Sequence, residues 1–229
     1  MELIVDPNYP TGYSPFPKSI AAWDLSAILP ESDSEIRRER SIPGAISQDS
    51  QGNVLLVDEG NAAILLFDKQ MRYIRAITVP EIYRPGRFVD ATATPDGNTI
   101  YGVERNSCSV FAFDREGKLK SRWGRRGSEA GDEFISPSGI AVDAEGAIFI
   151  SDSSLNDVRK FDSSGRLMAR WGGNLTERAA FHCPQSLSIP KANFILVDDV
   201  GHHCARLITP DGIESFPKGG LPRMSAPDK

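Results

Sequence analysis

Side chains that could bind a metal ion gather in one short part of the chain. All three histidines, His182, His202 and His203, lie there together with Cys183 and Cys204. Imidazole nitrogen and thiolate sulfur are ligands that zinc prefers. The spacing matches no standard zinc motif, and buried cysteines with hydrogen-bonded histidines are the alternative interpretation. We take His182, Cys183, His203 and Cys204 as candidate zinc ligands and otherwise expect no cofactor.

Arginine and tryptophan recur together in two segments, Arg122–Gly127 and Arg170–Gly172. Arg125 and Arg126 could reach a ligand, and arginine beside aromatic rings suits phosphate or RNA. Nearby acids dilute this charge, and the whole chain has a formal charge of −5 and a pI near 5.3. This balance argues against a general nucleic-acid binder. The two tryptophans are predicted to pack between structural units.

Motifs of common enzymes are missing from the sequence. There is no glycine-rich phosphate loop, Gly-x-Ser-x-Gly elbow, His-Glu-x-x-His helix or haem-attachment Cys-x-x-Cys-His. We therefore assign no catalytic residue, and a binding protein is favoured over an enzyme.

An internal repeat determines where these side chains lie. Segments 53–68, 99–114, 147–162 and 194–209 each consist of a strand, an acid, a polar loop, a second strand and a final hydrophobe. The final hydrophobes are separated by 46, 48 and 47 residues; they are Phe67, Phe113, Phe161 and Ile208. Four short strands need about this length, and pairs such as Asp96–Gly97 suit their hairpin turns. The repeat predicts an all-β protein, a β-propeller of four-stranded antiparallel blades.

One acid follows the second strand of each repeat, and a further one occurs near the N-terminus. The set is Asp6, Asp58, Glu104, Asp152 and Asp199. A ring of five acids could attract cations. Carboxylates before short loops more commonly accept hydrogen bonds from loop amides and so hold the turn. We expect this structural role.

The third repeat carries a family resemblance. Ser136–Asp152, followed by Val158–Asp162 and Arg170–Gly172, closely resembles the NHL repeat. The resemblance covers most of residues 43–217 and implies a propeller. It also permits RNA binding, because some NHL domains bind RNA through a basic face. One lyase of this repeat class holds zinc with residues from several blades, whereas here every histidine lies in one repeat.

The two ends of the chain together look like a fifth blade. Residues 2–6, 19–24 and 36–42 resemble its second, third and fourth strands, and Pro222–Lys229 resembles a first strand. Pairing of these ends would close the ring and leave no free sheet edge. We expect one domain, 1–229, with five blades at 1–42 plus 221–229, 43–84, 85–133, 134–180 and 181–220. The alternatives are part of a six-bladed ring and a half-ring completed in a dimer.

The propeller predicts where the candidate residues meet. Loops that precede a first strand and loops that follow a second strand emerge on the same face, so we expect a ligand-binding face that includes Arg125, Arg126, His182 and His203. The leading hypothesis is a scaffold that binds a protein or a small ligand. A metal-dependent lyase or hydrolase at the channel mouth and an RNA-binding protein are the alternatives.

Three scattered cysteines do not form a disulfide framework and favour a reducing compartment. The N-terminus lacks the features of a signal peptide, and no apolar run is long enough to span a membrane. We therefore expect a cytoplasmic monomer without membrane association. A secreted or periplasmic protein whose signal has been removed is the alternative.

Overall fold

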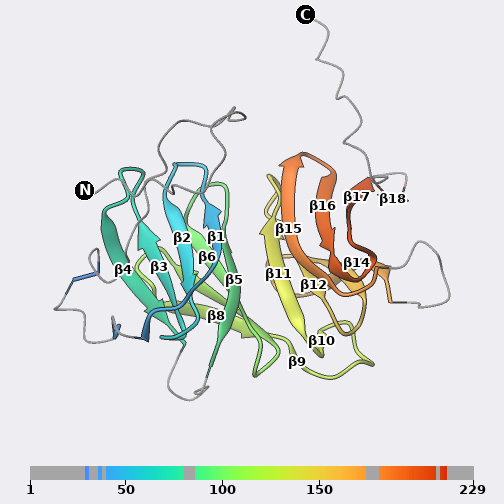
Figure 1. Cartoon of the computed structure of the whole chain (residues 1–229), viewed down its shortest axis with the longest axis horizontal. Coiled ribbons are helices and arrows are strands. Elements are labelled where there is room, and N and C mark those ends of the chain that lie inside the picture. Colours follow the sequence, from blue (N-terminus) through green and yellow to red (C-terminus); the bar gives the residue numbers. More distant parts are fainter. Residues whose placement is uncertain are drawn as a thin grey trace, which may run out of the picture.

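The computed structural model of the chain describes residues 29–30, 36–37, 40–79, 86–173, 181–209 and 212–215. These residues form four four-stranded antiparallel sheets and one short parallel pair (Figure 1). Each large sheet is a simple meander in which consecutive strands are neighbours. The predicted all-β propeller of four-stranded antiparallel blades is confirmed at this level.

The strand bounds follow the repeat. The first blade contains β1 (Pro43–Gln48), β2 (Val54–Asp58), β3 (Ala63–Phe67) and β4 (Tyr73–Thr78). The second contains β5 (Phe88–Ala93), β6 (Thr99–Glu104), β7 (Ser109–Asp114) and β8 (Leu119–Trp123). The third contains β11 (Pro137–Val142), β12 (Ile148–Asp152), β13 (Asp157–Phe161) and β14 (Leu167–Gly172). The fourth contains β15 (Pro184–Lys191), β16 (Phe194–Asp199), the 3₁₀ turn η3 (Val200–His202), β17 (Cys204–Thr209) and β18 (Gly212–Ser215). Between the second and third blades, β9 (Arg125–Arg126) pairs in parallel with β10 (Glu133–Phe134).

The first strand of each blade faces the centre of the molecule. β1 lies beside β5, β5 beside β11, and β11 beside β15, so these four inner strands form an arc (Figure 1). β1 and β15, at its two ends, share no sheet and make no extensive contact with each other. The four described blades therefore leave the arc open between the fourth blade and the first.

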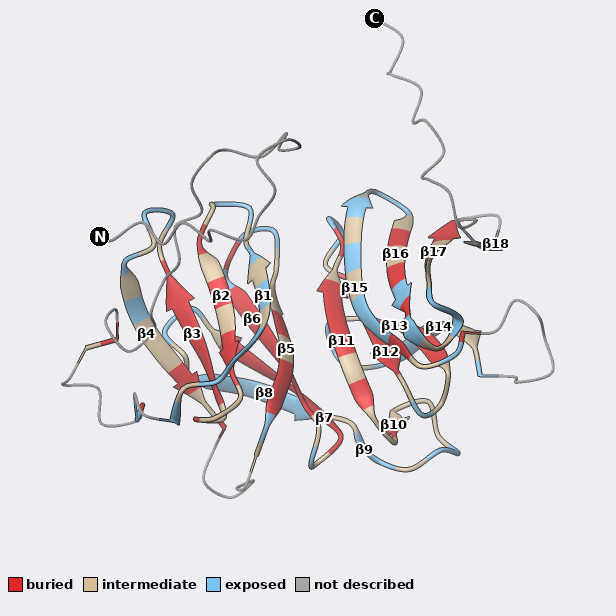
Figure 2. Ribbon diagram, in the orientation of Figure 1, coloured by how far each residue is buried: buried red, intermediate tan, exposed pale blue. Residues whose placement is uncertain are grey.

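Hydrophobic clusters between the blades hold the arc together. Three clusters join the first blade to the second, the second to the third, and the third to the fourth. Buried residues, red in Figure 2, make up much of strands such as β3, β5 and β11. The final hydrophobes of the repeat are at most 1% exposed; they are Phe67, Phe113, Phe161 and Ile208. Burial of a Phe or Ile side chain contributes about 1.5–3 kcal/mol. The repeat spacing thus reflects burial of one equivalent side chain in each blade.

The segment before β1 differs from its prediction. Residues 36, 37 and 40–42, the described part of the expected outer strand 36–42, are not in a strand. The first blade holds them instead, because the amide of Arg37 donates to Asn61 at 2.9 Å and the amide of Ile42 donates to Asp58 at 3.0 Å. The other predicted pieces of a fifth blade, residues 2–6, 19–24 and 222–229, lie outside the described residues. Among the helices that are described, none is long and apolar enough to cross a membrane.

Candidate functional site

A cavity of about 840 Å³ lies between the four inner strands. Every described blade contributes to its wall through β1, β5, β11 or β15. We call this cavity the channel. Its lining includes Ser47, Asp49, Glu59, Asp90, Thr92, Arg105, Ser138, Ile140, Gln185 and Ser186. A free strand edge presents unpaired backbone groups, so polar side chains on the inner strands have partners on the next blade.

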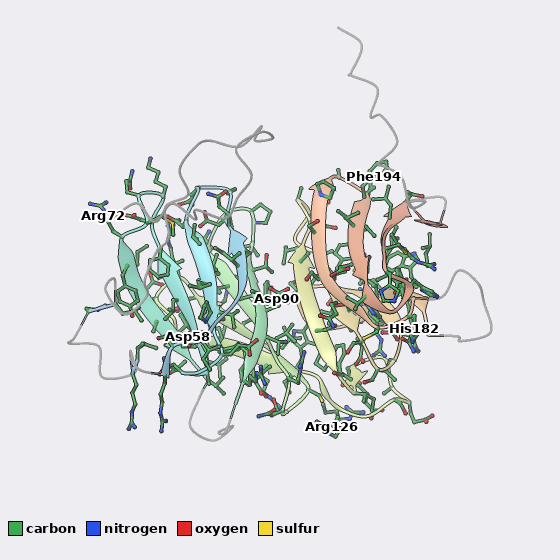
Figure 3. All side chains as sticks on the ribbon, in the orientation of Figure 1. Asp58, Arg72, Asp90, Arg126, His182 and Phe194 are labelled. Carbon is green, nitrogen blue, oxygen red and sulfur yellow. The ribbon has the colours of Figure 1, made fainter. Side chains whose placement is uncertain are left out.

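Asp90 provides the most unusual ionisable group in the channel (Figure 3). Its Oδ2 accepts a hydrogen bond from the amide of Ile140 on β11 at 2.9 Å, and its Oδ1 accepts one from the amide of Ala91 at 2.8 Å. Burial raises the pKa of this carboxyl to about 6, and the two amide bonds only partly oppose that effect. Asp90 therefore changes charge near neutral pH at the surface of the cavity.

Serines make similar links between the inner strands. The Ser47 hydroxyl donates to the carbonyl of Ala91 at 2.7 Å, and the Ser138 hydroxyl donates to the carbonyl of Pro184 at 2.8 Å. These bonds satisfy backbone groups that no strand of a neighbouring blade pairs. They also fix the spacing of the walls, so the channel is bordered by hydrogen-bonded strands.

Two oppositely charged residues occupy one repeat position in the channel wall. Glu59 directly follows the acid Asp58, and Arg105 directly follows the acid Glu104. Glu59 forms an ion pair with Arg87. Among the described residues, the Arg105 guanidinium has no hydrogen-bond or ion-pair partner, and its Nε is buried. The described part of the channel wall therefore contains one cation, Arg105, without a partner among the described residues.

Sequence comparison alone missed Asp90 and Arg105, although the repeat contained a signal for both. The repeat spacing aligns Asp90 with Gly44, Ser138 and Gln185, so an acid stands where the other inner strands carry uncharged residues. The amide of Ile140, to which Asp90 is bound, belongs to another blade and lies 50 residues away in the chain. The environment of Asp90 therefore could not be inferred from local pattern.

The acid after each second strand has the predicted structural role in the first three blades. Asp58, Glu104 and Asp152 are fully buried. Asp152, for example, accepts hydrogen bonds from the amides of Ile135, Ser136, Ser154 and Leu155. Each acid thereby joins the segment before the first strand to the turn after the second. Asp6 lies outside the described residues.

In the fourth blade the acid has different partners. Asp199 is fully buried and accepts from the amide of His182 at 2.7 Å. Its Oδ2 lies 2.8 Å from Nδ1 of His202 and 2.7 Å from Nε of Arg206. Nδ1 of His202 also lies 3.2 Å from Nη2 of Arg206, so its donor or acceptor role depends on the tautomer of the ring. The ring of His182 lies edge-on to His202, with centroids 5.4 Å apart.

The predicted zinc ligands do not assemble into a metal site. Within the described part of the chain, no group of three or more His, Cys, Asp or Glu side chains could hold a metal ion. His182 contacts His202, a residue outside the candidate set, while His203 adopts a left-handed backbone conformation and is exposed. The amide of Cys183 donates to Asn156 at 2.7 Å, and Cys204 begins β17. Positions that share a face thus need not direct their side chains to one point.

Two residues of the predicted ligand-binding face, Arg126 and His182, can be placed in Figure 3. Arg126 and His182 lie on the same side of the molecule as Asp58, whereas Arg72 and Phe194 lie on the opposite side (Figure 3). Arg125 is bound to Asp132 at 2.8 Å and Glu133 at 3.0 Å. These ion pairs reduce the positive charge that the face offers to a phosphate.

Trp123, two residues before β9, packs between blades and so fixes where the arginines of β9 begin. Trp123 lies 4.6 Å from Phe161 of the third blade, centroid to centroid. Trp171 of the third blade packs in the cluster that the third and fourth blades share. The predicted packing role of both tryptophans between blades is confirmed.

Comparison with known proteins supports this fold. No family model and no curated protein matches the chain. A streptogramin B lyase structure matches with a TM-score of 0.61 and 16% identity over 79% of this chain and 56% of that one. Virginiamycin B lyase from Staphylococcus aureus matches with a TM-score of 0.60 and 15% identity over 79% and 57%. A protein of unknown function from Bacteroides caccae matches with a TM-score of 0.53 and 15% identity over 77% and 60%.

These similarities define the class of the protein. It is an all-β propeller with four-stranded antiparallel blades, related in fold to virginiamycin B lyase structures. The chain spans slightly more than half the length of the two lyases. At 15–16% identity the likeness concerns the fold.

Proposed function

We propose that this protein binds a small ligand in the channel between its inner strands. The observation that carries the proposal is the cavity of about 840 Å³, whose wall combines uncharged polar groups with Asp90 and Arg105. Small-molecule sites are commonly clefts of about 300–1,000 Å³ with a few convergent polar groups and a shifted pKa. The case for a large partner is weaker, because Arg125 is already paired with Asp132 and Glu133.

A ligand-observed ¹⁹F NMR screen of fluorinated fragments tests this proposal. The variant Ser186→Trp places a bulky ring on an exposed, channel-lining position of β15. The control Ser163→Trp places the same ring in an exposed hairpin turn outside the channel. Some fragments should give ¹⁹F signals that broaden in the presence of the wild type or Ser163→Trp but stay sharp in the presence of Ser186→Trp. Such fragments support ligand binding in the channel. The absence of any such fragment would contradict it.

A lyase activity is the second candidate, and one geometric observation favours it. Asp199 holds the ring of His202 through Nδ1 at 2.8 Å, and in the tautomer whose Nδ1–H donates to Asp199, Nε2 could accept a proton from a substrate. One of the matching structures is a catalytically inactive histidine-to-alanine variant of virginiamycin B lyase with quinupristin, with a TM-score of 0.57 and 15% identity. Incubation of this protein with quinupristin, with and without added Mg²⁺ or Zn²⁺, followed by mass spectrometry, tests the activity. Turnover that His202→Gln abolishes would support it, and an unchanged antibiotic would exclude that substrate.

We further propose that the chain closes its own ring as five blades. In the three inter-blade clusters, one face of a blade packs against the next. On the far face of the first blade, Leu29 and Ile36 are buried against Ala63, Leu65 and Phe67. The N-terminal segment thus covers the surface where a preceding blade would pack. The alternatives remain a piece of a larger ring and a half-ring that completes itself in a dimer.

Deletion of residues 222–229 tests closure. If these residues supply the inner strand of a fifth blade, their loss should expose an edge and produce aggregation or a large fall in melting temperature. Light scattering after gel filtration would show whether the full chain is the expected monomer. A truncated protein that melts like the full chain, or a dimeric full chain, would contradict closure within one chain.

A further inference from the structure

The carboxylates of the channel wall are already satisfied by the protein. Asp49 accepts from the amides of Gln51 and Asn53 at 2.9 and 2.8 Å. Glu59 forms its ion pair with Arg87. Asp90 accepts from two backbone amides and has a pKa near 6, so its charge is partly lost near neutral pH. None of these acids is left to neutralise a further cation.

Arg105 has the opposite character. It is the one basic residue among the described residues that line the channel. Its guanidinium makes no hydrogen bond or ion pair with any residue that the structure describes, and its Nε is shielded from solvent. A buried donor without an acceptor is costly, and an arginine fork matches the oxygens of a carboxylate or phosphate. An incoming oxyanion would therefore gain a charge-assisted bond that replaces no existing one.

The backbone around Arg105 is fixed before any ligand arrives. Its amide donates to the carbonyl of Arg87 at 3.0 Å, and its own carbonyl accepts from the amide of Cys108 at 3.3 Å. Cys108 is fully buried, and its Sγ lies 3.4 Å from the same carbonyl. The turn after β6 thus holds the Cα of Arg105 at the channel wall, and a preorganised group loses less entropy on binding.

We infer that Arg105 is an anion-recognition residue of the channel and that the ligand carries a carboxylate or phosphate group. This inference rests on the proposed ligand-binding function. The shared chemistry is a small oxyanion attached to an organic body that fits the polar and apolar wall of the cavity. Glu59, at the same repeat position in the neighbouring blade, is held by Arg87. Because Arg87 already neutralises Glu59, Glu59 does not compete with a ligand oxyanion for Arg105.

Matched probes can test this assignment. We would titrate 4-(trifluoromethyl)benzoate, 4-(trifluoromethyl)phenyl phosphate and the neutral 4-(trifluoromethyl)benzamide by ¹⁹F NMR against the full chain. The channel-filling variant Ser186→Trp identifies binding inside the channel. Arg105→Gln removes the charge and keeps a polar side chain. Arg72→Gln is the control, because Arg72 is an exposed arginine in the turn before the outer strand β4 and is paired with Asp68. Melting temperatures establish that each variant is folded.

The expected result is a preference for an anion that depends on Arg105. At least one anionic probe should bind about tenfold tighter than the amide, a difference typical of one charge-assisted contact. Arg105→Gln should reduce that ratio to about one, and Arg72→Gln should leave it unchanged. Preference for benzoate over phosphate, or the reverse, identifies the kind of anion. Channel binding in which the amide equals both anions, or an anion preference that survives Arg105→Gln, would overturn the assignment of Arg105 alone. If no probe shows Ser186→Trp-sensitive binding, the ligand-binding proposal fails and this inference fails with it.

Discussion

The Asp90 carboxylate accepts a hydrogen bond from the backbone amide of Ile140 at 2.9 Å, and this bond joins the inner strands of the second and third blades. The acceptor is an ionisable group whose pKa burial raises to about 6. The contact between these blades is therefore coupled to protonation. An amide side chain at position 90 would keep one oxygen acceptor for the two backbone amides of Ile140 and Ala91, without the cost of a buried charge.

Asp90→Asn should stabilise the protein at pH 7.5 and have little effect near pH 4. The folded pKa of Asp90 lies above its ordinary value of 3.8, so the folded state binds more protons between about pH 4 and 6. The contribution of Asp90 to stability is present at low pH and is lost as the pH rises through 6. The variant should gain about 1–3 kcal/mol at pH 7.5, from the size of the shift. Urea unfolding across this pH range measures the difference in stability between the variant and the wild type. A difference that is the same at pH 4 and at pH 7.5 would contradict a raised pKa of Asp90.

Phe113→Ala should strongly destabilise the fold. Phe113 is 1% exposed and packs against Phe88 and Phe111 in the cluster between the first two blades. Removal of a buried Phe side chain typically costs about 3–5 kcal/mol. Met168→Ala is the control, because Met168 lies on the outer strand β14 and is 54% exposed. A loss below about 1 kcal/mol for Phe113→Ala, measured by urea denaturation, would show that the cluster is loosely packed.

Asp152→Ala should disrupt the link between the segment before β11 and the turn after β12. Four backbone amides lose their acceptor together, and each buried amide left unpaired costs about 1–3 kcal/mol before water enters. Asp152→Asn keeps one acceptor oxygen and should cost less. Hydrogen exchange of the amides of Ser154 and Leu155 provides a local measurement. Unchanged protection of these amides in Asp152→Ala would contradict the capping role.

Asp199→Asn tests the ion pair between Asp199 and Arg206, which distinguishes the fourth blade from the other three. Arg206 is only 5% exposed and lies 2.7 Å from Asp199, so the substitution leaves a buried guanidinium without its charged partner. Breaking such a pair from one side costs about 3–5 kcal/mol. The double variant Asp199→Asn with Arg206→Met should recover part of this loss. If the double variant is no more stable than the single one in thermal unfolding, the two side chains are not coupled.

Zinc should not bind stoichiometrically through His182, Cys183, His203 and Cys204, because the structure does not bring these side chains to one point. Protein purified without chelator and then dialysed with zinc should contain well below one equivalent by elemental analysis. The double variant His203→Ala with Cys204→Ala should contain the same amount. One equivalent of zinc that disappears in this variant would restore the original metal hypothesis.

The repeat predicted the fold well because packing repeats with it. Phe67 and Phe161 occupy equivalent strand positions, and Asp58 and Asp152 occupy equivalent turn positions, so one pattern located several blades. Side-chain direction within a loop does not follow from such a pattern. His182 was expected beside His203 but contacts His202, because η3 turns the chain by a 3₁₀ bend before the left-handed residue.

The roles of the channel residues could not be predicted from the sequence, for a related reason. Asp90 and Arg105 could be assigned to an inner strand and a turn, but their significance depends on groups in other blades. The amide that Asp90 binds lies 50 residues away, and the isolation of Arg105 is a property of the assembled wall. Comparison of equivalent repeat positions would have marked both as departures from their neighbours.

Amide chemical-shift mapping is the most direct test of the channel as the ligand-binding site. The measurement is a ¹H–¹⁵N TROSY titration of the ¹⁵N-labelled full chain with the tightest fragment from the ¹⁹F screen. We predict that the largest shifts fall on inner-strand amides such as Ser47, Thr92, Ser138 and Ser186, which all line the channel. Amides of the outer strands β4, β8 and β14 should shift little. Shifts concentrated on those outer strands, or on the Arg125–Arg126 face with the inner strands unaffected, would contradict ligand binding in the channel.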